Sequence, residues 1–75
     1  MIRIMVVYYQ SNIQKPDGTF VGSQSKVKVK DFQSRRPAQL KALATRITRR
    51  MMKRDGVREE NLSYSGWFDV PDEGT

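Results

Sequence analysis

Cysteine and histidine are both absent from this chain of 75 residues. Without cysteine there is no disulfide and no thiolate metal ligand, and without histidine the chain lacks the commonest general base and metal ligand. Metal or nucleophilic chemistry would have to depend on eight scattered acidic residues. We therefore predict that the protein is not an enzyme and that it holds no metal or cofactor.

Long apolar runs are missing as well. The apolar stretch at residues 1–9 is too short to span a bilayer, lacks the cleavage site of a signal peptide and continues into sequence typical of a strand. A chain of this length has room for one domain with a small core. We expect a single domain over residues 1–70, a loose acidic tail over residues 71–75, a cytoplasmic location and no membrane partner.

Acidic residues are scarce in the first three quarters of the chain. Residues 1–54 contain thirteen lysines and arginines against only Asp17 and Asp31, so their net charge is +11. Residues 55–75 have a net charge of −5, which leaves +6 for the whole chain. This uneven and mostly basic charge predicts an anionic partner.

A β-hairpin is predicted at the start of the chain. β-Branched and aromatic residues dominate residues 2–13, and polar and apolar residues alternate over residues 19–30. Between them, Pro16 sets φ for a turn, Asp17 suits the next position and Gly18 supplies a positive φ. This combination indicates a type I turn with a G1 bulge.

Two registers of this hairpin stay open. If Lys15 faces Thr19, the numbers of cross-strand partners sum to 34, which pairs Met5 with Val29 and Ile13 with Val21. A two-residue Asp17-Gly18 turn would instead move Met5, Val7 and Tyr9 to the opposite face. In both registers the strand's three lysines point away from the core; they are Lys26, Lys28 and Lys30.

An amphipathic helix should follow the hairpin. Its apolar residues share an arc of roughly 100°; they are Leu40, Leu43, Ala44, Ile47 and Met51. Ser34 is the expected N-cap, Pro37 fits the first turn, and Gly56 after Asp55 is a good stop.

Residues 62–70 alternate again and predict a third strand. One of its faces should carry Leu62, Tyr64, Phe68 and Val70, and the other Ser63, Ser65, Trp67 and Asp69. The first strand is apolar on both faces, which suits the centre of a sheet. We therefore expect an α+β fold of the ββαβ type: a three-stranded antiparallel sheet in the order 2-1-3, with one helix across the face of Val27 and Val29.

The sheet face without the helix is the predicted binding surface. We expect Trp67 and Tyr8 to lie together on it as an apolar centre surrounded by lysines. Cations neutralise phosphates and aromatic rings stack on bases, so this surface and the basic helix predict a nucleic-acid-binding protein with low sequence preference. The predicted binding residues are Tyr8, Lys26, Lys28, Lys30, Arg35, Arg36, Arg46, Arg49, Arg50, Lys53 and Trp67.

Each of these features has an alternative interpretation. Lysines on an edge strand protect it from pairing with other strands. Arginines on a helix commonly form only a solvated face. The uncovered sheet face could instead close a homodimer, which would make the chain a structural subunit.

The order of the elements also resembles a known group of proteins. Two strands, one amphipathic helix and a closing strand are similar to small phage-encoded proteins that disable host machinery, such as inhibitors of bacterial RNA polymerase and some anti-CRISPR proteins. The resemblance covers residues 2–70 and lies in element order and length, without a shared residue motif. It implies an inhibitor that binds an acidic or nucleic-acid-bearing host complex, although the helix here is basic where that of the polymerase inhibitor is acidic.

Overall fold

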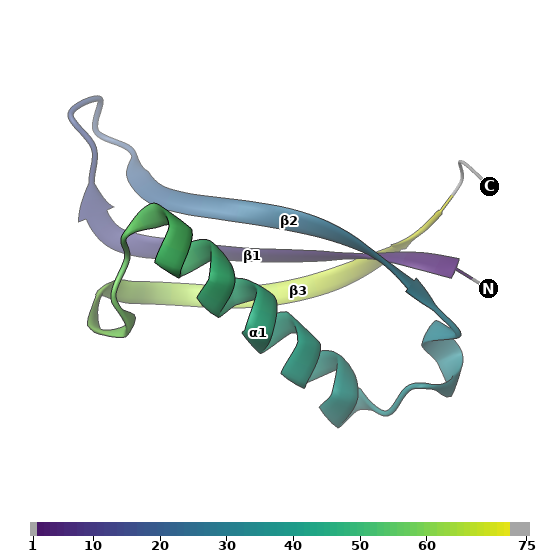
Figure 1. The fold of residues 1–75 in the computed structure, drawn as a ribbon. Helices are drawn as coiled ribbons and strands as arrows, with labels where there is room; N and C mark the ends of the chain where they lie inside the picture. The colour runs from purple at the N-terminus through teal and green to yellow at the C-terminus, as the bar shows by residue number, and fades with distance from the viewer. Residues whose placement is uncertain (1, 73–75) are drawn as a thin grey trace.

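The computed structural model describes residues 2–72 and shows an α+β fold in which one helix covers one face of a sheet. Its main elements are β1 (Ile2–Gln14), β2 (Phe20–Lys30), α1 (Pro37–Asp55) and β3 (Leu62–Pro71). The strands form an antiparallel sheet in the order β2-β1-β3, and α1 crosses the strands obliquely (Figure 1). The predicted fold class, strand order and helix are confirmed.

The turn of the hairpin has the predicted geometry. Gly18 has a φ of 91°, and its N–H donates to the carbonyl of Lys15 at 3.0 Å. The N–H of Lys15 donates to the carbonyl of Thr19 at 2.6 Å, so these two residues face each other. The two-residue turn is therefore wrong, because Lys15 closes a longer loop.

The register changes further along the hairpin. Gln14 pairs with Phe20, but from Gln10 with Gly22 onward the partner numbers sum to 32, so Met5 faces Val27 and not Val29. A shift of two residues leaves every side chain on its expected face, because the side-chain period of a strand is two. The predicted sum of 34 therefore holds only next to the turn, the pair of Met5 with Val29 is wrong, and Met5 and the lysines of β2 lie on their predicted faces.

Ser11 accommodates the irregularity in β1. Its side chain is 1 % exposed, and its hydroxyl donates to the carbonyl of Val21 at 2.8 Å and accepts from the N–H of Ile13 at 3.2 Å. These bonds replace ladder bonds that the bulge interrupts. The predicted pair of Ile13 with Val21 does not form.

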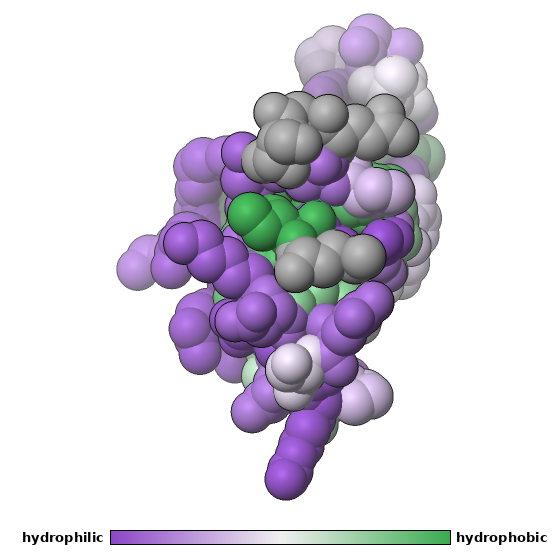
Figure 2. All heavy atoms as spheres, turned by 90° about the vertical axis from the view of Figure 1, so that its right-hand side faces the viewer, coloured by the Kyte–Doolittle hydropathy of each residue, from purple (hydrophilic) through white to green (hydrophobic). Residues whose placement is uncertain are grey.

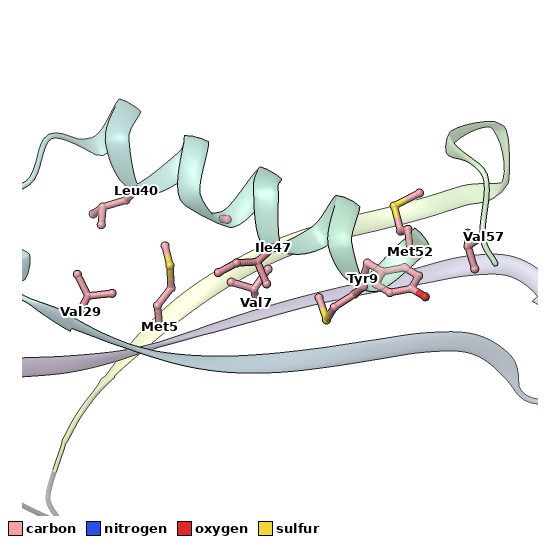
Figure 3. Packing of buried hydrophobic residues seen from close by; sticks show 10 residues of the cluster. Met5, Val7, Tyr9, Val29, Leu40, Ile47, Met52 and Val57 are labelled. Carbon is pink, nitrogen blue, oxygen red and sulfur yellow. The ribbon is translucent and has the colours of Figure 1, made fainter. Parts of the chain in front are cut away.

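The core lies between α1 and one face of the sheet. β1 contributes Met5, Val7 and Tyr9, which lie beneath Leu40, Ile47 and Met52 of the helix (Figure 3). The fully or nearly buried apolar residues of this layer are Met5, Val7, Tyr9, Val29, Leu40, Ala44, Ile47, Met51, Met52 and Val57. Met5 and Val7 are completely buried, as suits the central strand of the sheet.

The start of α1 differs from the prediction. Ser34 belongs to a 3₁₀ turn (Phe32–Ser34), and the N-cap is Arg36, whose N–H donates to the side-chain oxygen of Gln39 at 3.1 Å. Pro37 causes the difference, because a residue before proline prefers an extended conformation and Arg36 has a ψ of 148°. Gly56 ends the helix with a φ of 72°, as predicted.

β3 presents the opposite faces from those predicted. Trp67 lies opposite the buried Val7 and packs against the core under α1, so it does not lie with Tyr8 on the uncovered face. Tyr64 and Phe68 point to the uncovered face and are about half exposed. Alternation separates two sets of side chains but does not show which set faces the core.

A β-bulge places Leu62 on the other face from Tyr64 and Phe68, with which strict alternation would group it. Gln10 pairs with Tyr64 and the next residue, Ser11, pairs with Leu62, so Ser63 has no partner in β1. Leu62 consequently packs against the core together with Trp67.

The start of the predicted acidic tail is held in place. Pro71 is the last residue of β3, and Asp72 Oδ2 lies 3.5 Å from Lys28 Nζ. Residues 73–75 lie outside the described part of the chain, so the acidic tail stays a prediction. Among the helices of residues 2–72, none has the length and apolar character needed to cross a membrane.

Candidate functional site

The face of the sheet opposite α1 carries three rows of side chains, and we call it the open face. Val6 in the central row faces Lys26 on one side and Phe68 on the other, and Tyr8 faces Gln24 and Gly66. The three rows are Gln24, Lys26, Lys28 and Lys30 on β2, Ile4, Val6, Tyr8 and Gln10 on β1, and Tyr64, Gly66, Phe68 and Val70 on β3. Cations thus occupy one edge of the open face and aromatic rings the other.

Three aromatic rings form a cluster on the open face. The ring of Tyr8 lies 6.4 Å from that of Tyr64 in an edge-to-face arrangement, and 6.1 Å from the tilted ring of Phe68. Tyr64 is 52 % exposed and Phe68 is 50 % exposed, although the Tyr64 hydroxyl donates to Gln10 Oε1 at 2.6 Å. The aromatic cluster of Tyr8, Tyr64 and Phe68 therefore offers ring surface to a ligand.

Gly66 makes room for this cluster. A Cβ atom at Gly66 would lie 2.6 Å from the Tyr8 hydroxyl oxygen and 2.9 Å from the adjacent ring carbon. Tyr8 can therefore lie across β3 only because residue 66 has no side chain. This contact sets the position of the central ring between Tyr64 and Phe68.

The apolar strip beside the lysines is closely packed. Val6 is only 4 % exposed although no helix covers it, because Lys26 and Phe68 stand on either side of it. The lysine stems thus cover apolar surface while their charged ends stay in water. The open face therefore has a closely packed apolar centre between the lysines of β2 and the rings of β3.

Lys26 and Lys30 are available to bind anions. Neither ammonium group forms an ion pair with a carboxylate of residues 2–72, whereas Lys28 lies near Asp72. On the helix side of the same edge, Arg50 and Arg54 border a small hollow of about 180 Å³ together with Ser25 and Val27 of β2. The β2 edge therefore carries cations on both of its faces.

In comparisons with protein-family models, curated proteins and solved structures, none matches this chain. Within the described residues, no group of three or more acidic side chains is placed to hold a metal ion. The chemistry of the open face therefore has to be judged from its own geometry and charge.

The other predicted cations do not join the open face. Arg46, Arg49 and Lys53 are exposed on α1, on the other side of the sheet, and Arg49 Nε lies 3.6 Å from Glu59 Oε1. Arg35 and Arg36 lie in the connection before α1, where Arg35 Nε donates to the carbonyl of Lys30 at 3.3 Å. The eleven predicted residues thus belong to separate surfaces.

Trp67 belongs to a groove between α1 and β3. The groove has a volume of about 630 Å³ and is open to solvent. Its apolar lining includes Ala44, Met52 and Leu62 besides Trp67, and Lys41 and Arg49 lie at its border. This groove arises because α1 packs mainly over β1 and β2 and leaves β3 partly uncovered.

A polar network anchors the end of α1 to the sheet, and we call it the Asp55 network. Asp55 Oδ2 accepts from the Tyr9 hydroxyl at 2.5 Å and from Ser23 Oγ at 2.6 Å, and Asp55 Oδ1 accepts from Arg54 Nε at 3.0 Å. These hydrogen bonds lower the pKa of Asp55 to about 2, with that from Arg54 having the largest effect. Burial, reinforced by Asp55, raises the pKa of Tyr9 to about 12.

The Asp55 network is structural in character. Tyr9 is 3 % exposed, and Asp55, which contributes to raising its pKa, accepts the hydrogen bond of its hydroxyl. The sequence identified Asp55 only as the residue before the helix stop. Its partners Tyr9 and Ser23 lie 46 and 32 residues away, beyond the reach of any local pattern.

The end of the molecule at which the termini lie shows how hydrophobic and hydrophilic residues are distributed there. Figure 2 looks at the molecule from the right-hand side of Figure 1, where the chain termini lie, and shows hydrophobic atoms gathered at the centre with hydrophilic atoms around them. Hydrophilic residues therefore surround the hydrophobic ones at this end of the domain.

Proposed function

We propose that this chain is a non-enzymatic protein of the cytoplasm that binds single-stranded nucleic acid on its open face. The observation that carries the proposal is the placement of Lys26 and Lys30 on the same uncovered surface as the aromatic cluster. Phosphates attract lysines, and every base has a face that can stack on a ring.

The spacing of the two rows suits a strand lying across the sheet. β2 and β3 are separated by the central strand, so their side chains stand about 10 Å apart. A nucleic-acid strand on this surface would place its backbone along the lysines and its bases against Tyr64 and Phe68. The paired bases of a duplex do not expose their faces in this way, which favours a single strand.

Binding should weaken as salt is added. For two phosphate contacts to a single strand, from Lys26 and Lys30, the affinity is expected to fall about sevenfold between 50 and 200 mM salt. Fluorescence anisotropy of a labelled oligothymidine measures this slope directly. An affinity that is the same at both salt concentrations would rule out phosphate contacts as the source of binding.

An abasic oligomer of the same length provides the matched control. It keeps the phosphates but has no bases, so stacking on the aromatic cluster is lost and the affinity should fall about tenfold or more. Equal affinity for both oligomers would show that the rings do not contribute. A role as a phage inhibitor of a host complex stays a prediction based on element order alone.

A further inference from the structure

The two edges of the sheet differ in their protection against further pairing. β2 carries Lys26, Lys28 and Lys30, and lysines discourage another strand from joining an edge. β3 at the other edge contains one charged residue, Asp69, and Arg3 holds its carboxylate. Within residues 2–72, β1 is the only strand that pairs with β3, so its outer edge is available.

The available edge has defined limits. At one end the bulge at Ser63 interrupts the strand, and at the other end Pro71 has no N–H to donate. Between them, residues 64–70 form an uninterrupted strand of roughly 23 Å at 3.3 Å per residue. This length is sufficient for regular pairing with a second strand.

The groove between α1 and β3 lies above the same edge strand. Trp67 projects from β3 into this groove and remains partly exposed there. A strand added beside β3 would direct every second side chain toward the groove, since alternate residues of a strand share a face. The edge and the groove therefore form one continuous docking surface.

Most of the charges near β3 are compensated. Three cations there lie close to carboxylates, in the ion pairs Arg49–Glu59, Arg58–Glu60 and Arg3–Asp69. Among residues 2–72, Lys41 at the border of the groove forms no such pair. The chain as a whole has a net charge of +6, which repels a second copy. The β3 edge is the surface on which two copies can meet with little repulsion.

We propose that β3 pairs antiparallel with β3 of a second copy of this chain. Across a two-fold axis the same edge of both copies meets, so β3 can pair antiparallel with its own copy. The sheet then continues over six strands. Trp67 of each copy would lie beside the groove of the other and cover part of its apolar lining. The proposal does not depend on nucleic-acid binding, and it leaves the open faces of both copies uncovered.

Sedimentation equilibrium with a charged edge variant tests the dimer. The chain should show a mass of twice 8.7 kDa at high micromolar concentration. When residues 64–70 pair antiparallel with their own copy, Ser65 lies opposite Asp69 of the second copy. Ser65→Asp therefore places like charges across the interface and should raise the dissociation constant at least about tenfold. Gln24→Asp adds the same charge on the β2 edge and should leave the dimer unchanged.

The single tryptophan gives a second measurement on the unaltered chain. Quenching of Trp67 fluorescence by acrylamide should decrease as the protein concentration rises, because the partner shields the indole. A monomeric mass up to millimolar concentration would overturn the proposal, as would a dimer that Ser65→Asp does not weaken. A dimer lost in Phe68→Ser but kept in Ser65→Asp would also overturn it, because the open face would then be the interface.

Discussion

Asp55→Ala is expected to lower the free energy of unfolding by about 2–4 kcal/mol. The substitution removes the acceptor of the Tyr9 hydroxyl, and Tyr9 is only 3 % exposed. A buried donor without a partner costs about 1–3 kcal/mol, and the bonds to the carboxylate are lost in addition. A chain of this length has a total stability of about 4–11 kcal/mol, so the loss should be evident in urea unfolding.

Glu60→Ala is the matched control for this experiment. Its carboxylate lies 3.6 Å from Arg58 Nη1, and both side chains are largely exposed. Exposed ion pairs contribute little, so the change in stability should stay below about 0.5 kcal/mol. Equal unfolding midpoints for Asp55→Ala and the unaltered chain would contradict the role of the Asp55 network.

The same network predicts how stability depends on pH. The pKa of Asp55 is lowered from 3.8 to about 2, so its contribution is fully present above pH 4 and is lost as the pH falls toward 2. The pKa of Tyr9 is raised from 10.0 to about 12, so its contribution is present below pH 10 and is lost as the pH rises toward 12. Urea midpoints across pH should show both losses.

Two variants separate these two branches. In Asp55→Ala the urea midpoint should change less as the pH falls from 4 toward 2. In Tyr9→Phe, which retains the ring in the core, the midpoint should change less as the pH rises from 10 toward 12. If the loss of stability at low pH is the same in Asp55→Ala as in the unaltered chain, other carboxylates cause it.

Reversing two lysines on the open face should abolish most nucleic-acid binding. The double variant Lys26→Glu with Lys30→Glu is expected to lower the affinity for a single strand about 100-fold or more, because two phosphate contacts become repulsions. Both side chains are exposed, so the fold should be unaffected. Fluorescence anisotropy at low salt measures the change.

The helix provides a control with the same change in charge. Arg46→Glu with Lys53→Glu alters α1 on the side remote from the open face, and the affinity should fall less than about fivefold through the change in net charge alone. Equal losses in both double variants would mean that total charge, and not the open face, governs binding.

Local signals explain why the fold could be predicted from the sequence. Pro16, Asp17 and Gly18 specify the turn, and the helix reveals its buried side through residues such as Leu40 and Ile47. Each of these signals acts over a few residues, and the structure follows all of them. The strand order followed from the apolar character of β1 on both faces.

Features that depend on long-range pairing could not be predicted in the same way. Both sets of alternating residues in β3 contain large apolar side chains, and pairing with Val7 decides that Trp67 faces the core. The bulges near Ser11 and at Ser63 shift the register without a local signal. The aromatic cluster, with Tyr64 and Phe68 in place of Trp67, emerged only once the strands were aligned.

Mapping of amide chemical shifts during titration with a short oligothymidine tests the central claim most directly. We expect the largest changes along the open face, at Lys26, Lys30, Tyr8 and Phe68, with small changes over the outer side of α1. Changes concentrated at Arg46 and Lys53 of the helix, with the open face unaffected, would contradict the account.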